Sequence, residues 1–75
     1  MKETIKQIVA DVMEVPVASI TDDSSPDTIP AWDSLKHMNL VLSLEQQFNI
    51  TFSEEQIAEM MNVQLILLTV QELMA

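Results

Sequence analysis

Ala31-Trp32-Asp33-Ser34-Leu35 is the stretch that decides the fold, because a proline-bearing acidic loop ends there and an apolar segment, Leu35 to Phe48, begins. The residue pattern of this segment predicts a helix with Ser34 at its start. Backbone N–H groups at a helix N-terminus lack intrahelical partners, and the helix dipole favours an anion there. Ser34 is therefore a good position for holding a phosphodiester, and the rest of the chain offers little else that could do chemistry.

The segment before this loop has the spacing of an amphipathic helix. Five apolar residues recur every three or four positions and form one stripe: Ile5, Ile8, Val9, Val12 and Met13. Pro16 ends this helix or lies just beyond its end. From Val17 to Trp32, turn-forming residues and two more prolines predict a long loop. Long loops in compact domains are usually functional or held down by their own side chains. We expect Ile20, Ile29 and Trp32 to anchor this one.

Capping residues define the second and third helices. The second helix starts at Asp33 or Ser34 and should end at Asn49, the best residue for a left-handed cap in a chain without glycine. The stretch 53–56, Ser-Glu-Glu-Gln, has the form of a capping box and predicts a short third helix. We expect Ile57 and Met60 to face inward from this helix.

A fourth helix completes the predicted fold. Asn62 can cap a helix that runs from Val63 to about Met74. Apolar and polar residues nowhere alternate with period two for long enough to form a strand. The sequence therefore predicts an all-α fold, a small four-helix bundle of three longer helices plus one short helix, with a long loop between helices one and two.

Length and charge limit what the protein can do. Its 75 residues allow one domain, residues 1–75, with one small core, and such domains typically have only ~3–5 kcal/mol of stability. Three Lys/Arg against twelve Asp/Glu give a formal net charge of -9. This charge argues against binding nucleic acid or anionic membranes, and it favours partners with basic faces.

Several other functional classes are disfavoured by what the sequence lacks. With no cysteine there is no disulfide, no thiolate nucleophile and no sulfur-based zinc site, and we expect no metal site. The N-terminal residues have no apolar run typical of a secretory signal, and no apolar stretch approaches the ~20 residues that span a bilayer. We therefore expect a cytoplasmic monomer without stable membrane insertion.

The second predicted helix is more apolar than one buried stripe requires. At about 100° per residue, one face consists of four residues: Leu40, Val41, Leu44 and Phe48. Leu35, Met38 and Leu42 form a second stripe displaced from the first. A single such residue would usually belong to the core. A domain this small has difficulty burying two stripes, so the set of three indicates a docking surface.

The chain resembles an acyl carrier protein over essentially its whole length. The resemblance rests on five segments: Ala31 to Leu35, Leu40 to Phe48, Ile50 with Phe52, Ser53 to Gln56, and Met60 to Val63. Asp-Ser-Leu alone would be a weak signal. It is a strong one where it opens this helix in an acidic chain of this length. The resemblance implies a free-standing carrier that is not an enzyme and has no catalytic residues.

The resemblance also implies a cofactor and its partners. Ser34, flanked by Asp33 and Leu35, would receive 4′-phosphopantetheine from coenzyme A through a phosphopantetheinyl transferase. The thiol of this arm would carry acyl groups as thioesters to acyl-loading and acyl-transfer or condensing enzymes. Partner recognition would fall to six residues: Leu35, Lys36, Met38, Asn39, Leu42 and Glu45. The acyl cavity would be lined or bordered by another six: Leu44, Phe52, Ile57, Met60, Val63 and Ile66.

The sequence departs from the family pattern on the second helix. Carriers that serve fatty acid synthesis usually have an acid directly after Asp-Ser-Leu and further acids along this helix. Here the position directly after Asp-Ser-Leu is Lys36. Of the later recognition positions on this helix, only Glu45 is an acid. Because rim charges set association rate and partner choice, the sequence predicts a carrier in a specialised biosynthetic pathway. A surface change without functional effect is the alternative for Lys36.

The same residues are also compatible with other functions. An aminoacyl or peptidyl carrier would have the same fold and serine, so the class of cargo stays open. A module that only docks its second helix in a partner's groove is the alternative from another class, and it would not need Ser34. Asp33, Ser34 and His37 suggest a nucleophilic triad, but the chain has no glycine for an oxyanion hole and no room for a substrate cleft. We expect His37 to be a solvated surface residue.

Overall fold

The computed structural model describes residues 1–75 and contains four α-helices and no strand. The elements are α1 (Lys2–Met13), a 3₁₀ turn η1 (Val17–Ser19), α2 (Ser34–Phe48), α3 (Glu54–Glu59) and α4 (Val63–Met74). The predicted all-α bundle of three longer helices and one short helix is confirmed. No helix is long and apolar enough to cross a membrane.

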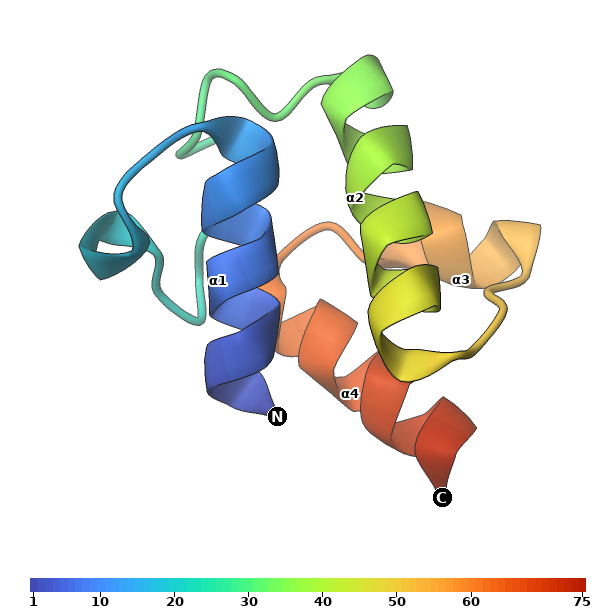
Figure 1. Cartoon of the computed structure of the whole chain (residues 1–75). Helices are drawn as coiled ribbons and strands as arrows, with labels where there is room; N and C mark the ends of the chain where they lie inside the picture. The colour runs from blue at the N-terminus through green and yellow to red at the C-terminus, as the bar shows by residue number, and fades with distance from the viewer.

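The helices pack around one core. In Figure 1, α1 and α2 lie side by side and run in opposite directions, and α4 runs from beside the lower half of α1 to below the end of α2. The short α3 lies beside α2 on the side away from α1. The long connection between α1 and α2 passes around the outside of α1 and reaches the start of α2 at one end of the bundle.

The ends of the helices follow from their capping residues. The Asp33 carboxylate accepts a hydrogen bond from Lys36 N at 2.9 Å and caps α2. Ser53 and Gln56 form a reciprocal capping box at α3. Asn49 ends α2 in the left-handed conformation, as predicted, with φ 54°. Glu14 does the same for α1 with φ 58°, although a left-handed backbone usually costs a residue other than glycine or asparagine about 1–2 kcal/mol.

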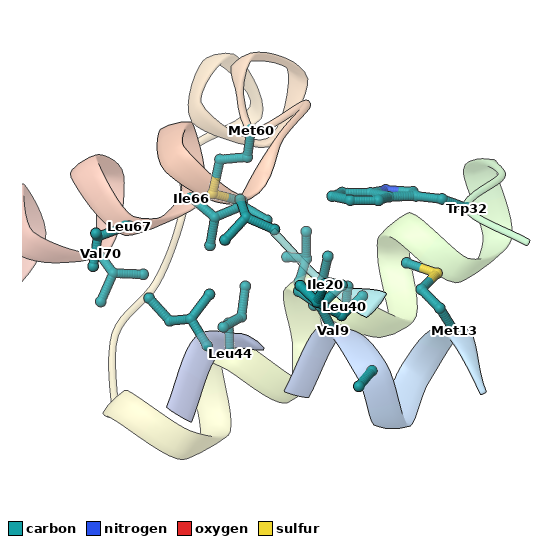
Figure 2. Close-up of a cluster of buried hydrophobic side chains, with 14 of the residues drawn as sticks. Val9, Met13, Ile20, Trp32, Leu40, Leu44, Met60, Ile66, Leu67 and Val70 are labelled. Carbon is teal, nitrogen blue, oxygen red and sulfur yellow. The ribbon is translucent and has the colours of Figure 1, made fainter. Parts of the chain in front are cut away.

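One apolar cluster holds the helices together. Its members come from all parts of the chain, and ten side chains in it are almost fully buried: Ile5, Val9, Met13, Leu40, Val41, Leu44, Met60, Val63, Ile66 and Val70. In Figure 2, Leu44 of α2 points toward Met60 and Ile66, which come from the C-terminal third of the chain. The predicted inner face of α2 is therefore the face that joins the core, with Phe48 half-buried at its end.

The long loop is packed down by the three anchors that the sequence predicts. Ile20, Ile29 and Trp32 are all buried and belong to the core cluster. Trp32 lies at one end of that cluster in Figure 2. The loop is not structureless, however, because Val17–Ser19 forms a 3₁₀ turn that the sequence analysis missed. Pro16, with φ -62°, precedes this turn in an extended conformation.

The same loop completes the start of α4. Val63 N donates to Ser24 O at 3.1 Å, and Gln64 N donates to Asp22 O at 3.0 Å. Leu65 N donates to the Asn62 side chain at 2.7 Å. The first three N–H groups of α4, which no helix can satisfy internally, thus all have partners. The α1–α2 loop and Asn62 supply them.

Asp22 also links the loop to α1 through ion pairs. Its carboxylate lies 3.0 Å from Lys2 Nζ and 3.3 Å from Lys6 Nζ. The hydrogen bond from Lys2, followed by that from Lys6, lowers the pKa of Asp22 below its usual value of 3.8. Two of the three basic residues of the chain are used in this contact.

Leu40→Ala should destabilise the fold far more than Leu42→Ala, two positions along the same helix. Leu40 is 0% exposed and Leu42 is 53% exposed. Removing a buried leucine typically costs about 2–5 kcal/mol, which is similar to the whole stability of a domain this size. An exposed substitution usually costs less than about 0.5 kcal/mol. Urea unfolding followed by circular dichroism would measure both, and equal losses would contradict this assignment of faces.

Asp22→Asn should lower the stability at neutral pH, and the difference from wild type should disappear in acid. Because the pKa of Asp22 is lowered in the folded state, the folded protein binds this proton less readily than the unfolded chain does. The stabilisation is therefore present above the usual value of 3.8 and is lost as the pH falls through the lowered pKa. Unfolding midpoints from pH 7 down to about pH 2 would test this, with Asp23→Asn as the control. A difference that persists in acid would count against the ion pairs.

Candidate functional site

Ser34 is the first residue of α2 and is exposed to solvent. The Asp33 carboxylate accepts a hydrogen bond from Lys36 N, and the backbone of Asp33 is extended where the chain enters the helix. The Ser34 hydroxyl makes no hydrogen bond, so it is free to react. It lies at the helix end where the dipole favours a negative group.

The other serines of the chain are less available. Four of them use the hydroxyl in local hydrogen bonds that shape turns or cap a helix: Ser19, Ser24, Ser25 and Ser53. Ser43, on α2, is half-buried. Ser34 is therefore the one serine that is both exposed and without a hydrogen bond from its hydroxyl.

A hollow of about 440 Å³ opens directly beside Ser34, between the start of α2 and α3. We call it the Ser34 hollow. Its lining includes Trp32, Ser34, His37, Met38, Ile57 and Met61. The hollow thus has an aromatic and aliphatic lining next to a free hydroxyl, which is the combination that small-molecule sites commonly use.

The charges at the hollow are negative. The carboxylate residues Asp33 and Glu54 lie in its lining, and no lysine does. All three basic residues of the chain are paired elsewhere: Lys2 and Lys6 with Asp22, and Lys36 with Glu14 at 3.3 Å. The hollow therefore has no cation of its own to hold an anionic group.

The second apolar stripe of α2 remains outside the core, as predicted. Leu35 is 71% exposed, Met38 is 46% exposed and Leu42 is 53% exposed. This exposed apolar surface begins one residue after Ser34, and Met38 also lines the Ser34 hollow. An apolar patch beside a reactive group is typical of a surface that meets partners.

The remaining predicted recognition residues differ in how free they are. Asn39 is exposed. Lys36 is half-buried and pairs with Glu14 of the α1 end. Glu45 accepts a hydrogen bond from Phe52 N at 2.9 Å and so holds the segment between α2 and α3. Lys36 and Glu45 therefore have structural contacts that the sequence did not reveal.

Most of the six predicted cavity residues lie in the packed core. Five are buried: Leu44, Phe52, Met60, Val63 and Ile66. Only Ile57 lines the Ser34 hollow, where it is half-buried rather than fully inward-facing. An acyl chain that reached the other five would have to enter the core itself. Their role as a cavity stays a prediction.

His37 is not the solvated surface residue that the sequence predicted. Trp32 Nε1–H donates to His37 Nδ1 at 3.0 Å, and His37 Nε2 bonds to Ile57 O at 2.8 Å. The histidine is half-buried because it fills the space between the loop, α2 and α3. Both ring nitrogens are occupied, which also removes His37 as a base for a triad. The sequence did contain one sign that His37 lies near the site, because its three-residue spacing from Ser34 places both residues on one helix face.

Comparison with known proteins identifies the family. A family model described as a phosphopantetheine attachment site matches residues 3–70. The solution NMR structure of a holo acyl carrier protein from Geobacter metallireducens is similar, with a TM-score of 0.86 and 30% sequence identity over 97% of this chain and 84% of that one. This chain belongs to the acyl carrier protein family. Another relative, polyketide-8 synthase acyl carrier protein 2 of Streptomyces avermitilis, is 29% identical over 63 residues, which are 84% of this chain and 72% of that protein.

As an acyl carrier protein, the chain carries a covalent 4′-phosphopantetheine arm. The residues present fit such a group. A phosphodiester needs a hydroxyl that is accessible and unbonded, and its charge suits a helix N-terminus. The Ser34 end of α2 supplies both, with an apolar hollow alongside for the arm.

Proposed function

We propose that Ser34 is the attachment point of the 4′-phosphopantetheine arm. The observation that carries this proposal is the free, exposed Ser34 hydroxyl at the first position of α2. The N-terminus of α2 stabilises the phosphodiester through its dipole and its backbone N–H groups. Asp33 holds this helix end in place through its bond to Lys36 N, and Leu35 begins the surface beside the arm.

The protein acts as a carrier and not as a catalyst. When bound, the arm supplies a terminal thiol that holds acyl groups as thioesters. The chain itself supplies the anchor, a hollow next to it and an exposed apolar helix face. No nucleophile paired with a free base lies near Ser34, since both nitrogens of His37 are engaged. Chemistry on the cargo therefore falls to partner enzymes.

Partners meet the exposed side of α2. These are a phosphopantetheinyl transferase, which loads the arm, and the enzymes that load, transfer or condense the acyl group. Leu35, Met38 and Leu42 offer them an apolar patch of three neighbouring side chains. The net charge of -9 favours partners with basic faces around that patch. The carrier works as a monomer in the cytoplasm.

The carrier serves a specialised biosynthetic pathway. The Streptomyces avermitilis relative is named as a polyketide synthase carrier, which supports this class of pathway. The α2 surface supports it too, because Lys36 replaces an acid and Glu45 is occupied by Phe52 N. The exposed face of α2 consequently presents little of the negative charge that a general fatty acid synthesis enzyme would bind.

Incubation with coenzyme A and a broad-specificity phosphopantetheinyl transferase should add one phosphopantetheine to the wild type and none to Ser34→Ala. Intact-mass spectrometry measures the gain. Ser43→Ala, on the same helix, is the control and should be loaded like wild type. If folded wild type gained nothing, or if Ser34→Ala were loaded, the attachment site would be wrong. A helix-docking module would then be the better account.

Lys36→Glu should improve recognition by a condensing enzyme of general fatty acid synthesis that presents Lys/Arg to α2. The substitution restores an acid next to the patch, and we expect about a tenfold rise in kcat/KM at low salt that shrinks at high salt. Lys36→Gln separates loss of the Glu14 pair from gain of negative charge. Equal kcat/KM values for all three proteins would mean that residue 36 does not decide partner choice.

A further inference from the structure

His37 joins three segments through one hydrogen-bonded chain. Trp32 Nε1–H donates to His37 Nδ1 at 3.0 Å, and His37 Nε2 lies 2.8 Å from Ile57 O. The two rings also stack, with centroids 6.2 Å apart and planes inclined by 23°. An indole N–H is only a donor and a carbonyl is only an acceptor. Both contacts are satisfied together only by a neutral imidazole that carries its proton on Nε2.

One of these hydrogen bonds supports the shortest of the four α-helices. With six residues, α3 is too short to be stable without tertiary contacts. The last four carbonyls of a helix have no intrahelical donor, and the Ile57 carbonyl is one of them. His37 Nε2–H supplies that donor from α2. Without this contact, α3 would be held by Ile57, which packs against the core, and by the flanking residues Phe52 and Met60, which are buried in it.

Protonation of His37 breaks the hydrogen bond that it accepts from Trp32. In the imidazolium both ring nitrogens are donors, so Nδ1–H would face the indole N–H. Trp32 is 3% exposed, and its N–H would lose its partner in a place that water reaches poorly, which is unfavourable. Histidine is the side chain whose ordinary titration falls between about pH 5 and 8.

The charged side chains that line the Ser34 hollow together with His37 are both carboxylates. Asp33 at the start of α2 and Glu54 of α3 line the same hollow as His37. The nearest lysine in sequence, Lys36, is neutralised by Glu14. The chain as a whole carries -9.

We propose that His37 is a positioning residue that holds the Trp32 indole when neutral and releases it when protonated, thereby changing the wall of the Ser34 hollow. Trp32 and His37 both line that hollow, so losing their hydrogen bond changes the wall on the Trp32 side, while the bond from His37 Nε2–H to Ile57 O is kept. The consequence for cargo rests on the proposed function of Ser34. The hydrogen bonds of His37 do not need the arm, so they are tested in the protein that lacks it.

The chain offers a clean test because it contains one Trp and one His. The full-length Ser34→Ala protein, which remains without an arm, would be followed by NMR and fluorescence from about pH 8 to pH 5. The indole N–H resonance and the Trp32 emission should change together with the His37 ring signals. Amide hydrogen exchange in α3, corrected for intrinsic rates, should stay unchanged at the acid end, because the imidazolium still donates from Nε2 to Ile57 O.

Two variants separate this mechanism from a general effect of acid. His37→Gln offers an acceptor and a donor without titrating, so it should retain slow exchange in α3 and show a Trp32 signal that does not change over this pH range. His37→Phe should show fast exchange in α3 at every pH. A pH response in His37→Gln equal to that in the His37 protein would overturn the proposal, since the carboxylates would then be its cause.

The wild-type titration keeps the proposal falsifiable even if a variant fails to fold. An indole N–H resonance that does not move while the His37 ring titrates would overturn it. Loading of Ser34 by the transferase is a separate mass measurement. If the proposed role of His37 were wrong, Ser34 could still be the attachment site. If Ser34 were not loaded, the proposed role of His37 would be unaffected.

Discussion

Leu40, Val41 and Leu44 pack the inner face of α2 into the core, and the rest of the structure depends on this contact. A chain of 75 residues has only one cluster of buried side chains to hold its helices. Because α2 joins the core through one face, its other face and its N-terminus remain free. The exposed stripe and the free Ser34 hydroxyl are both consequences of how this single helix is placed.

The polar contacts then fix the pieces that the small core cannot hold. Asp22 ties the long loop to α1, Glu45 holds the turn before α3, and His37 joins α3 to Trp32. Each of these side chains is half-buried or exposed. In a larger domain such connections would be made by apolar burial. Here they leave the region around Ser34 dependent on a few hydrogen bonds.

The sequence predicted the features that depend on local rules. Helix spacing and capping residues gave the four helices, the left-handed end at Asn49 and the division of α2 into a buried and an exposed face. The loop anchors followed from the rule that a long loop must bury some side chains of its own. These features could be predicted because each depends on residues close together in the chain.

What the sequence did not reveal depends on residues distant in the chain. The 3₁₀ turn at 17–19, the Glu45 contact with Phe52 and the bridge from His37 to Ile57 all require knowledge of which segments meet. The usual behaviour of a residue type gave the wrong environment for both side chains. A lone histidine on a helix flank is usually solvated, and a glutamate on an exposed helix is usually free. Neither expectation includes the backbone groups that need partners from elsewhere, Phe52 N in the segment before α3 and Ile57 O in its last turn.

The hydrogen bonds from Val63 and Gln64 of α4 to Ser24 and Asp22 have a kinetic consequence. They join residues about forty positions apart, so the start of α4 is completed only after the long α1–α2 loop has closed on it. Contacts between such distant positions slow the folding of an otherwise local helical fold. They also make folding cooperative, because the loop that leads to Ser34 and the last helix become ordered in the same step.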